Sequence, residues 1–152
     1  MLANIVVFLI VNFAGLAIGS IFTNSGVRSN WYAQLHKAPW TPPGWVFGVA
    51  WSTIMVCFAI YMAFALKTDP DSKTLFMLFG LQWFLNVLWN PIFFKFHKTG
   101  LALLTILCLT AVVLVLSYRF YYQLNLKSLL VAPYLIWLFI AISLNAYVVF
   151  KN

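Results

Sequence analysis

The sequence predicts an all-α integral membrane protein built as a bundle of five transmembrane helices. Of its 152 residues, 64% are hydrophobic and only 7% are charged, whereas about a quarter of the residues of an ordinary soluble domain are charged. The few charged residues leave five stretches that carry no charge, and each is long enough for the roughly 20 apolar residues that a helix needs to cross a bilayer. These two observations exclude a water-soluble globule.

The five expected helices belong to one membrane domain, residues 1–152. They cover about residues 2–22, 44–66, 74–94, 99–118 and 128–150. A membrane β-barrel would show segments of about ten residues that alternate apolar and polar side chains, and the apolar stretches here are continuous instead. The first stretch lacks the basic start of a signal peptide, so we expect it to remain as a helix.

The connections carry almost all of the charge. The longest connection, 23–43, contains Lys37 and ends in Pro42 and Pro43, which suit the first turn of a helix. Its length favours a cap over a site. The formal net charge of +7 is scattered along the chain, which makes nucleic acid an unsuitable partner. Lys and Arg are nearly balanced between the two sides, so orientation stays open, but five spans place the two termini on opposite sides.

No Asp, Glu, Lys, Arg or His lies within an expected span, although such a residue is the usual sign of an ion or proton pathway. Amides and tryptophans supply the interior polarity instead. In the third span Asn86 and Trp89 share one helical face with Gln82 and Phe93. Amides are costly against lipid, so this face should point into the bundle. It either holds helices together or lines a ligand cavity, and composition does not choose between the two.

Two further spans combine tryptophan with small residues. In the fifth span Trp137, Ala141 and Asn145 recur on one face, and in the second span Trp45 and Gly48 lie on one face with Trp51 nearby. Small residues beside tryptophan form slots for flat aromatic ligands, although the same spacing also occurs in ordinary packing. In the first span Gly15 and Gly19 predict a close contact with another helix of the same chain. His36 and His97 lie in connections on one side, and we predict solvated side chains there, with no metal.

Several segments of the sequence resemble the motifs of one protein family. The segment WYAQLHKAPWTPPGWVFGVAW, from Trp31 to Trp51, is similar to the most recognisable stretch of the translocator protein family, also called peripheral benzodiazepine receptor or tryptophan-rich sensory protein (TspO/MBR). QWFLNVLWNPIFF from Gln82 and PYLIWLFIAISLN from Pro133 agree with it. With five spans in a chain of this length, the resemblance covers essentially the whole sequence and is highly specific.

The resemblance implies a pocket under the first connection that binds tetrapyrroles, with protoporphyrin or haem as ligand and no required cofactor. By motif position the ligand-binding residues would be Trp31, Trp40, Trp45, Gly48, Trp51, Asn86, Trp89, Trp137, Ala141 and Asn145. Some bacterial relatives degrade protoporphyrin in light, and the two tryptophans of that chemistry correspond to Trp51 and Trp137. Trp faces would stack on the macrocycle while amides and loop cations meet its propionates.

Three functions follow as alternatives. The first is a sensor, regulator or carrier of porphyrin-type ligands, the second an enzyme that degrades protoporphyrin photo-oxidatively, and the third a transporter of lipids or small molecules. Gly100, Leu101 and Thr105 stand where animal members of the family have a Gly-Trp pair and an acid, so drug binding does not carry over. The segment 146–151 around Tyr147 departs from the family's sterol-recognition segment, so cholesterol binding does not carry over either. The expected location is a bacterial cell membrane, and the sequence leaves a homodimer open.

Overall fold

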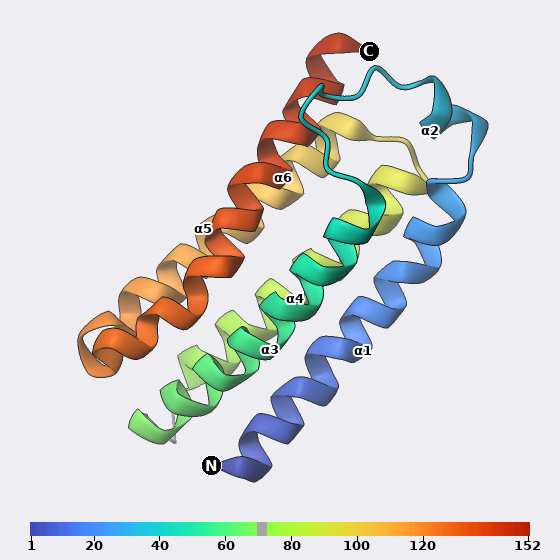
Figure 1. Cartoon of the computed structure of the whole chain (residues 1–152). Helices are drawn as coiled ribbons and strands as arrows, with labels where there is room; N and C mark the ends of the chain where they lie inside the picture. Colours follow the sequence, from blue (N-terminus) through green and yellow to red (C-terminus); the bar gives the residue numbers. More distant parts are fainter. Residues whose placement is uncertain (70–72) are drawn as a thin grey trace.

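The computed structural model describes residues 1–69 and 73–152, and these residues form an elongated helical bundle (Figure 1). Its long helices are α1 (Leu2–Gly26), α3 (Gly44–Thr68), α4 (Lys73–Phe94), α5 (Thr99–Leu124) and α6 (Ala132–Lys151). A short helix, α2 (Asn30–Gln34), lies in the first connection, and a 3-10 helix, η1 (Asn125–Val131), joins α5 to α6. No strand occurs in the described residues. The all-helical prediction is therefore confirmed, with five long helices in the predicted order.

Four helical segments of the described chain are long and apolar enough to cross a membrane. They are Leu2–Gly26, Gly44–Thr68, Lys73–Phe94 and Thr99–Lys151. The last segment contains both α5 and α6, because η1 keeps the backbone helical where the chain turns back. We predicted a loop over 119–127, but α5 continues to Leu124. Leu116, Phe120 and Leu124 are buried at successive i+4 positions, so packing extends the helix past Arg119.

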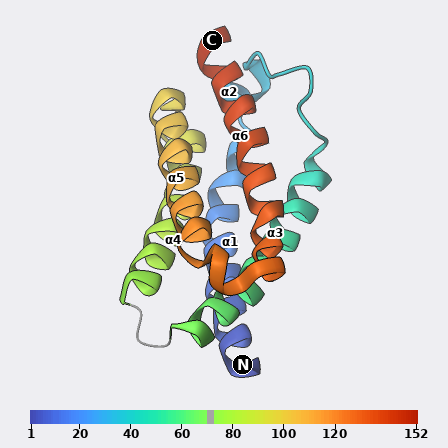
Figure 2. The ribbon, with the colours of Figure 1, turned by 90° about the vertical axis from the view of Figure 1, so that its left-hand side faces the viewer.

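The long helices form a closed ring. Helix α1 packs against α3 and α4, α4 packs against α5, and α5 packs against α6. Contacts of α6 and η1 with α3 complete the ring. The helices run along a common direction in both views (Figures 1 and 2), and the N-terminus and the C-terminus lie at opposite ends of the bundle.

An aromatic core fills the middle of the ring. The ring centroids of Phe58 and Tyr134 are 5.2 Å apart, and those of Phe8 and Phe79 are 4.9 Å apart. The Tyr134 hydroxyl donates to Gln82 Oε1 at 2.9 Å. This contact links α6 to α4, so Gln82 points into the bundle as predicted and acts there as a contact between helices.

Glycines let α1 approach α4 closely. A Cβ at Gly15 would lie 2.5 Å from Nε1 of Trp83, and a Cβ at Gly19 would lie 2.7 Å from Nδ2 of Asn90. The Trp83 indole N–H donates to the Val11 carbonyl at 2.8 Å. The predicted close contact within the chain is thus confirmed, and its partner is α4.

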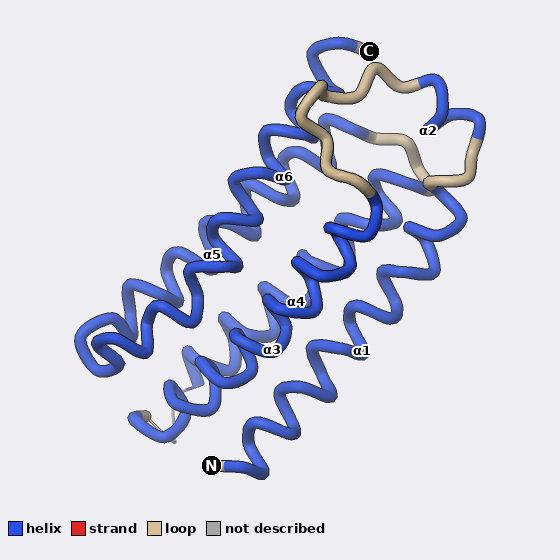
Figure 3. Tube along the Cα trace, in the orientation of Figure 1, coloured by secondary structure: helices blue, strands red, loops and turns tan. Residues whose placement is uncertain are grey.

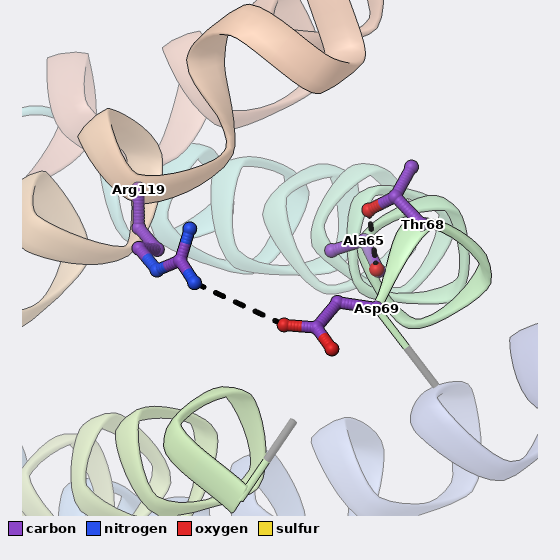
Figure 4. Close-up of polar contacts among 4 residues, drawn as sticks. All are labelled: Ala65, Thr68, Asp69 and Arg119. Carbon is purple, nitrogen blue, oxygen red and sulfur yellow. Dashed lines mark hydrogen bonds and ion pairs between the residues drawn. The ribbon is translucent and has the colours of Figure 1, made fainter. Parts of the chain in front are cut away.

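The two ends of the bundle differ. The connection 27–43, the α4–α5 connection and the end of α6 gather at one end (Figure 3). At the other end Arg119 of α5 reaches Asp69 after α3, with 4.0 Å between Nη2 and Oδ2 (Figure 4). Both side chains are substantially exposed, so this pair contributes little to stability. The expected spans 44–66 and 74–94 leave a connection at 67–73, and part of it, residues 70–72, lies outside the described residues.

Candidate functional site

A cavity of about 80 Å³ lies beneath the connection 27–43, at the end of the bundle where the chain also ends. Helices α3, α4 and α6 form its walls. Its lining is largely apolar and strongly aromatic, and consists of Tyr32, Lys37, Ala38, Thr41, Phe47, Trp89, Phe93, Phe94, Ala141, Leu144, Asn145 and Val148. Such a mixture, in which few polar groups interrupt an aromatic wall, is typical of small-molecule sites.

One buried amide orients the tryptophan in the wall. Asn145 Oδ1 accepts the indole N–H of Trp89 at 3.0 Å, and Asn145 Nδ2 donates to the Thr99 carbonyl at 2.9 Å. The amide therefore ties α6 to both α4 and the start of α5. Because both of its polar atoms have partners, Asn145 holds the Trp89 ring in one orientation.

Aromatic rings continue from Trp89 toward the surface. Trp89 and Phe93, one turn apart on α4, stack with centroids 5.0 Å apart at 17°. The ring centroids of Trp31 and Phe93 lie 5.6 Å apart in an edge arrangement. The Trp31 ring also stacks on His97, with 4.0 Å between the centroids. Trp31 thus packs behind the wall, between Phe93 and the α4–α5 connection.

The connection 27–43 forms the roof of the cavity, and a few specific contacts hold it in place. Ser29 caps α2, since its hydroxyl oxygen accepts the Tyr32 amide N–H at 3.2 Å. Partial burial raises the pKa of the Tyr32 hydroxyl. The Trp40 indole donates to Ser143 Oγ at 3.2 Å. Asn152 receives the His36 amide N–H at 2.9 Å and donates to the His36 carbonyl at 3.3 Å. The connection is therefore attached to α6 at two places.

The structure brings only part of the predicted set to the cavity. Trp89, Ala141 and Asn145 line it. Trp137 does not line the cavity but packs against Phe47, which does, with 5.2 Å between the ring centroids. Trp51 lies farther along α3, and its ring centroid is 6.0 Å from that of Tyr134. Trp31 and Trp40 belong to the roof and its attachments.

Three predicted residues lie outside the lining. Trp45 is 71% exposed, Gly48 is exposed with no atom within 4 Å of a Cβ placed there, and Asn86 is half-buried on α4. On α3 the inward face runs through Phe47 instead of Gly48. In a membrane helix the outer face is as apolar as the inner one, so apolar spacing alone could not tell these two faces apart.

Sequence reasoning missed most of the cavity's apolar lining. The α6 positions 141, 144, 145 and 148 follow helical i, i+3, i+4, i+7 spacing, which could have extended the predicted face to Leu144 and Val148. Phe47 has no comparable signal. In the described residues, no group of three or more His, Cys, Asp or Glu side chains could hold a metal ion. His36 and His97 are exposed and have the separate contacts described above.

Comparisons with known proteins agree with this architecture. Residues 6–150 match the TspO/MBR family. The chain belongs to the TspO/MBR family. It is 34% identical over 151 residues to the tryptophan-rich protein TspO of Archaeoglobus fulgidus, covering 95% of this chain and 92% of that protein. It is 34% identical over 132 residues to Protein CrtK of Rhodobacter capsulatus, covering 85% and 80%. Identity to the human translocator protein is 33% over 136 residues, covering 86% and 79%.

Membership in the TspO/MBR family and the apolar helices identify the chain as an integral membrane protein. The family resemblance predicted from the motif at Trp31–Trp51 is thereby confirmed. Within this family member, the cavity under the connection 27–43 is the candidate functional site, because it combines an oriented tryptophan with an aromatic wall beneath a separate connection.

Proposed function

We propose that this TspO/MBR protein binds a tetrapyrrole, of the protoporphyrin or haem class, in the cavity under the connection 27–43 and acts as a sensor, regulator or carrier of that ligand. The observation that carries the proposal is the aromatic wall of Phe47, Trp89, Phe93 and Phe94 beneath a separate roof. Flat aromatic ligands gain most from such walls through stacking and edge contacts.

The cavity's size adds a mechanical requirement. Its volume is about 80 Å³, whereas sites for drug-sized ligands measure about 300–1,000 Å³. A macrocycle can therefore enter only if the roof moves. The roof is joined to α6 by the Trp40–Ser143 and Asn152–His36 hydrogen bonds and by the contact between the Trp40 and Tyr147 rings, and these contacts would open while the bundle stays folded. Occupancy would then displace the connection, and this displacement provides a signal for a sensor.

We further propose that five helices cross the membrane. Helices α5 and α6 have 26 and 20 residues, and each length suffices for a bilayer core that needs about 20 residues. They lie side by side and are joined by η1 at the end far from the cavity (Figure 1). A bacterial cell membrane remains the proposed location, which fractionation of the expressing cells tests. The question of a homodimer stays open.

The test is a titration of the protein in nanodiscs with protoporphyrin in the dark, followed by tryptophan fluorescence. Saturable quenching beyond that of empty nanodiscs supports the proposal. Trp89→Phe should weaken binding because it replaces the indole of the wall with a smaller ring that lacks the hydrogen bond to Asn145. Trp45→Phe, at an exposed position on α3, should bind like the wild type. Quenching that never saturates, or that is equally sensitive to both variants, would refute binding in this cavity.

The enzyme alternative rests on Trp137, which contacts Phe47 of the wall directly from behind. Illuminating the same sample separates the two functions. Loss of the porphyrin absorbance with one discrete product, abolished in Trp51→Phe and Trp137→Phe, would support photo-oxidative degradation. A stable spectrum supports a binder. Flux of labelled ligand into proteoliposomes, absent from empty vesicles, would support the transporter alternative.

A further inference from the structure

Most polar groups of the cavity are already engaged within the protein. The Trp89 indole N–H is taken up by Asn145, and the Asn145 amide N–H donates to the Thr99 carbonyl. The Thr41 hydroxyl donates to the Ala38 carbonyl at 2.7 Å. The Asn145 amide keeps one N–H and the Thr41 oxygen can still accept, but these remaining groups are neutral and few, so the cavity favours a ligand with a largely apolar surface.

Lys37 is different, because it is the one charged residue among those that line the cavity. Its Nζ donates to the Tyr32 carbonyl at 2.8 Å and lies 4.5 Å from the centroid of the Tyr32 ring. An ammonium group has three N–H donors. The contact with Tyr32 uses one of them, which leaves two donors for an acceptor on a ligand.

No carboxylate of the described residues pairs with Lys37. The one ion pair found there joins Arg119 to Asp69, at the far end of the bundle (Figure 4). The connections at the cavity end and the end of α6 instead carry further cations, Arg28, Lys95, Lys98 and Lys151. This end of the molecule therefore attracts anions, and Lys37 is the cation that borders the cavity.

We propose that the cavity selects flat apolar ligands that carry a carboxylate at one edge, and that Lys37 binds this carboxylate. The inference rests on the proposed function and adds the ligand's charge requirement to it. A hydrogen bond between two charged groups is about twice as strong as one between neutral groups. The apolar body would lie against Phe47, Trp89 and Phe93, and the carboxylate would remain at the mouth, where it is not fully desolvated.

The experiment compares protoporphyrin, which has two carboxylates, with its neutral dimethyl ester. Both are titrated in the dark into nanodiscs containing the wild type, Lys37→Met or Lys98→Met, with empty nanodiscs to subtract partitioning into lipid. Lys98 is the matched control because it lies at the same end and carries the same charge, but does not line the cavity. Lys37→Arg, which keeps the charge, is the second variant.

The wild type should bind the diacid on the order of tenfold more tightly than the ester, as one charge-assisted hydrogen bond would produce. Lys37→Met should lose this preference while its affinity for the ester stays unchanged, which also shows that the variant is folded. Lys98→Met and Lys37→Arg should keep the preference.

Two results would overturn the inference. If the wild type binds acid and ester equally, or if Lys37→Met keeps the full preference, then Lys37 does not select the carboxylate although the proposed tetrapyrrole binding stands. If neither compound binds saturably to the wild type, the proposed function itself fails and the inference fails with it. The ester arm therefore distinguishes the two failures.

Discussion

The contact between Gly15 and Trp83 gives a prediction about stability that can be worked out from the structure. Gly15→Ala adds one methyl group, which would lie 2.5 Å from Nε1 and 3.1 Å from Cε2 of Trp83. Both distances are shorter than an ordinary van der Waals contact, so the indole ring must shift. The same indole N–H donates to the Val11 carbonyl, and a shift of the ring stretches or breaks this bond.

Opposing terms decide the size of the effect. Overpacking a tight contact costs about 1–3 kcal/mol, and loss of a hydrogen bond costs about 0.5–1.5 kcal/mol. In the opposite direction, alanine stabilises a helix by about 0.5–1 kcal/mol relative to glycine. We therefore expect Gly15→Ala to lower the free energy of unfolding by about 1–3 kcal/mol.

Gly80→Ala is the matched control, because Gly80 is also helical and no atom lies within 4 Å of a Cβ placed there. It should leave the stability unchanged or raise it slightly. Unfolding is measured by circular dichroism in mixed micelles of mild detergent and dodecyl sulfate, at increasing dodecyl sulfate fractions. If Gly15→Ala proves as stable as Gly80→Ala, the close packing of α1 on α4 does not limit stability and the reasoning is wrong.

Three further predictions concern the site. Asn145→Leu leaves the Trp89 N–H and the Thr99 carbonyl without their partner, so the same unfolding assay should show a loss of about 1–3 kcal/mol; unchanged stability would mean that these groups find new partners. Asn152→Ala removes two hydrogen bonds to the His36 backbone, so the connection 27–43 should open more readily. Stopped-flow fluorescence should then show severalfold faster association and dissociation of protoporphyrin, with little change in Kd. Unaltered rates would mean that this contact does not hold the connection closed. Burial raises the pKa of Tyr32 above its ordinary value of 10.0. The unfolded chain therefore loses this proton first as pH rises, and stability should fall from about pH 10 upward; Tyr32→Phe should remove part of that fall, and an identical pH profile would contradict it.

Much of the fold could be predicted from the sequence because charge and hydropathy act locally. The positions of Lys67, Lys73, Lys95 and Lys98 mark where chain segments must end near water, and the helix bounds of α3 and α4 follow them closely. The end of α5 does not follow this rule. Arg119 lies within the helix because burial of Phe120 and Leu124 continues the packing beyond the charge.

The site was predicted only in part, and particular residues show why. Asn145 and Trp89 were predicted because a polar group in an apolar span is costly against lipid and must find a partner inside. Phe47 was missed and Gly48 was favoured, although they are neighbours on α3, because a phenylalanine suits lipid as well as a cavity wall. The roles of Tyr32 and Lys37 depend on how the connection 27–43 folds back over the bundle, which local sequence does not specify.

The sequence by itself therefore determined which segments leave water, how many long helices they form and which family the chain resembles. The tertiary structure decided which face of each helix points inward, which tryptophan reaches the cavity and which cation stands at its mouth. The physical reason is that lipid and protein interior are almost equally apolar. Hydropathy separates both from water but does not distinguish one from the other. Specific contacts, such as the packing of Gly15 and Gly19 on α4 and the hydrogen bonds of Asn145, settle the arrangement.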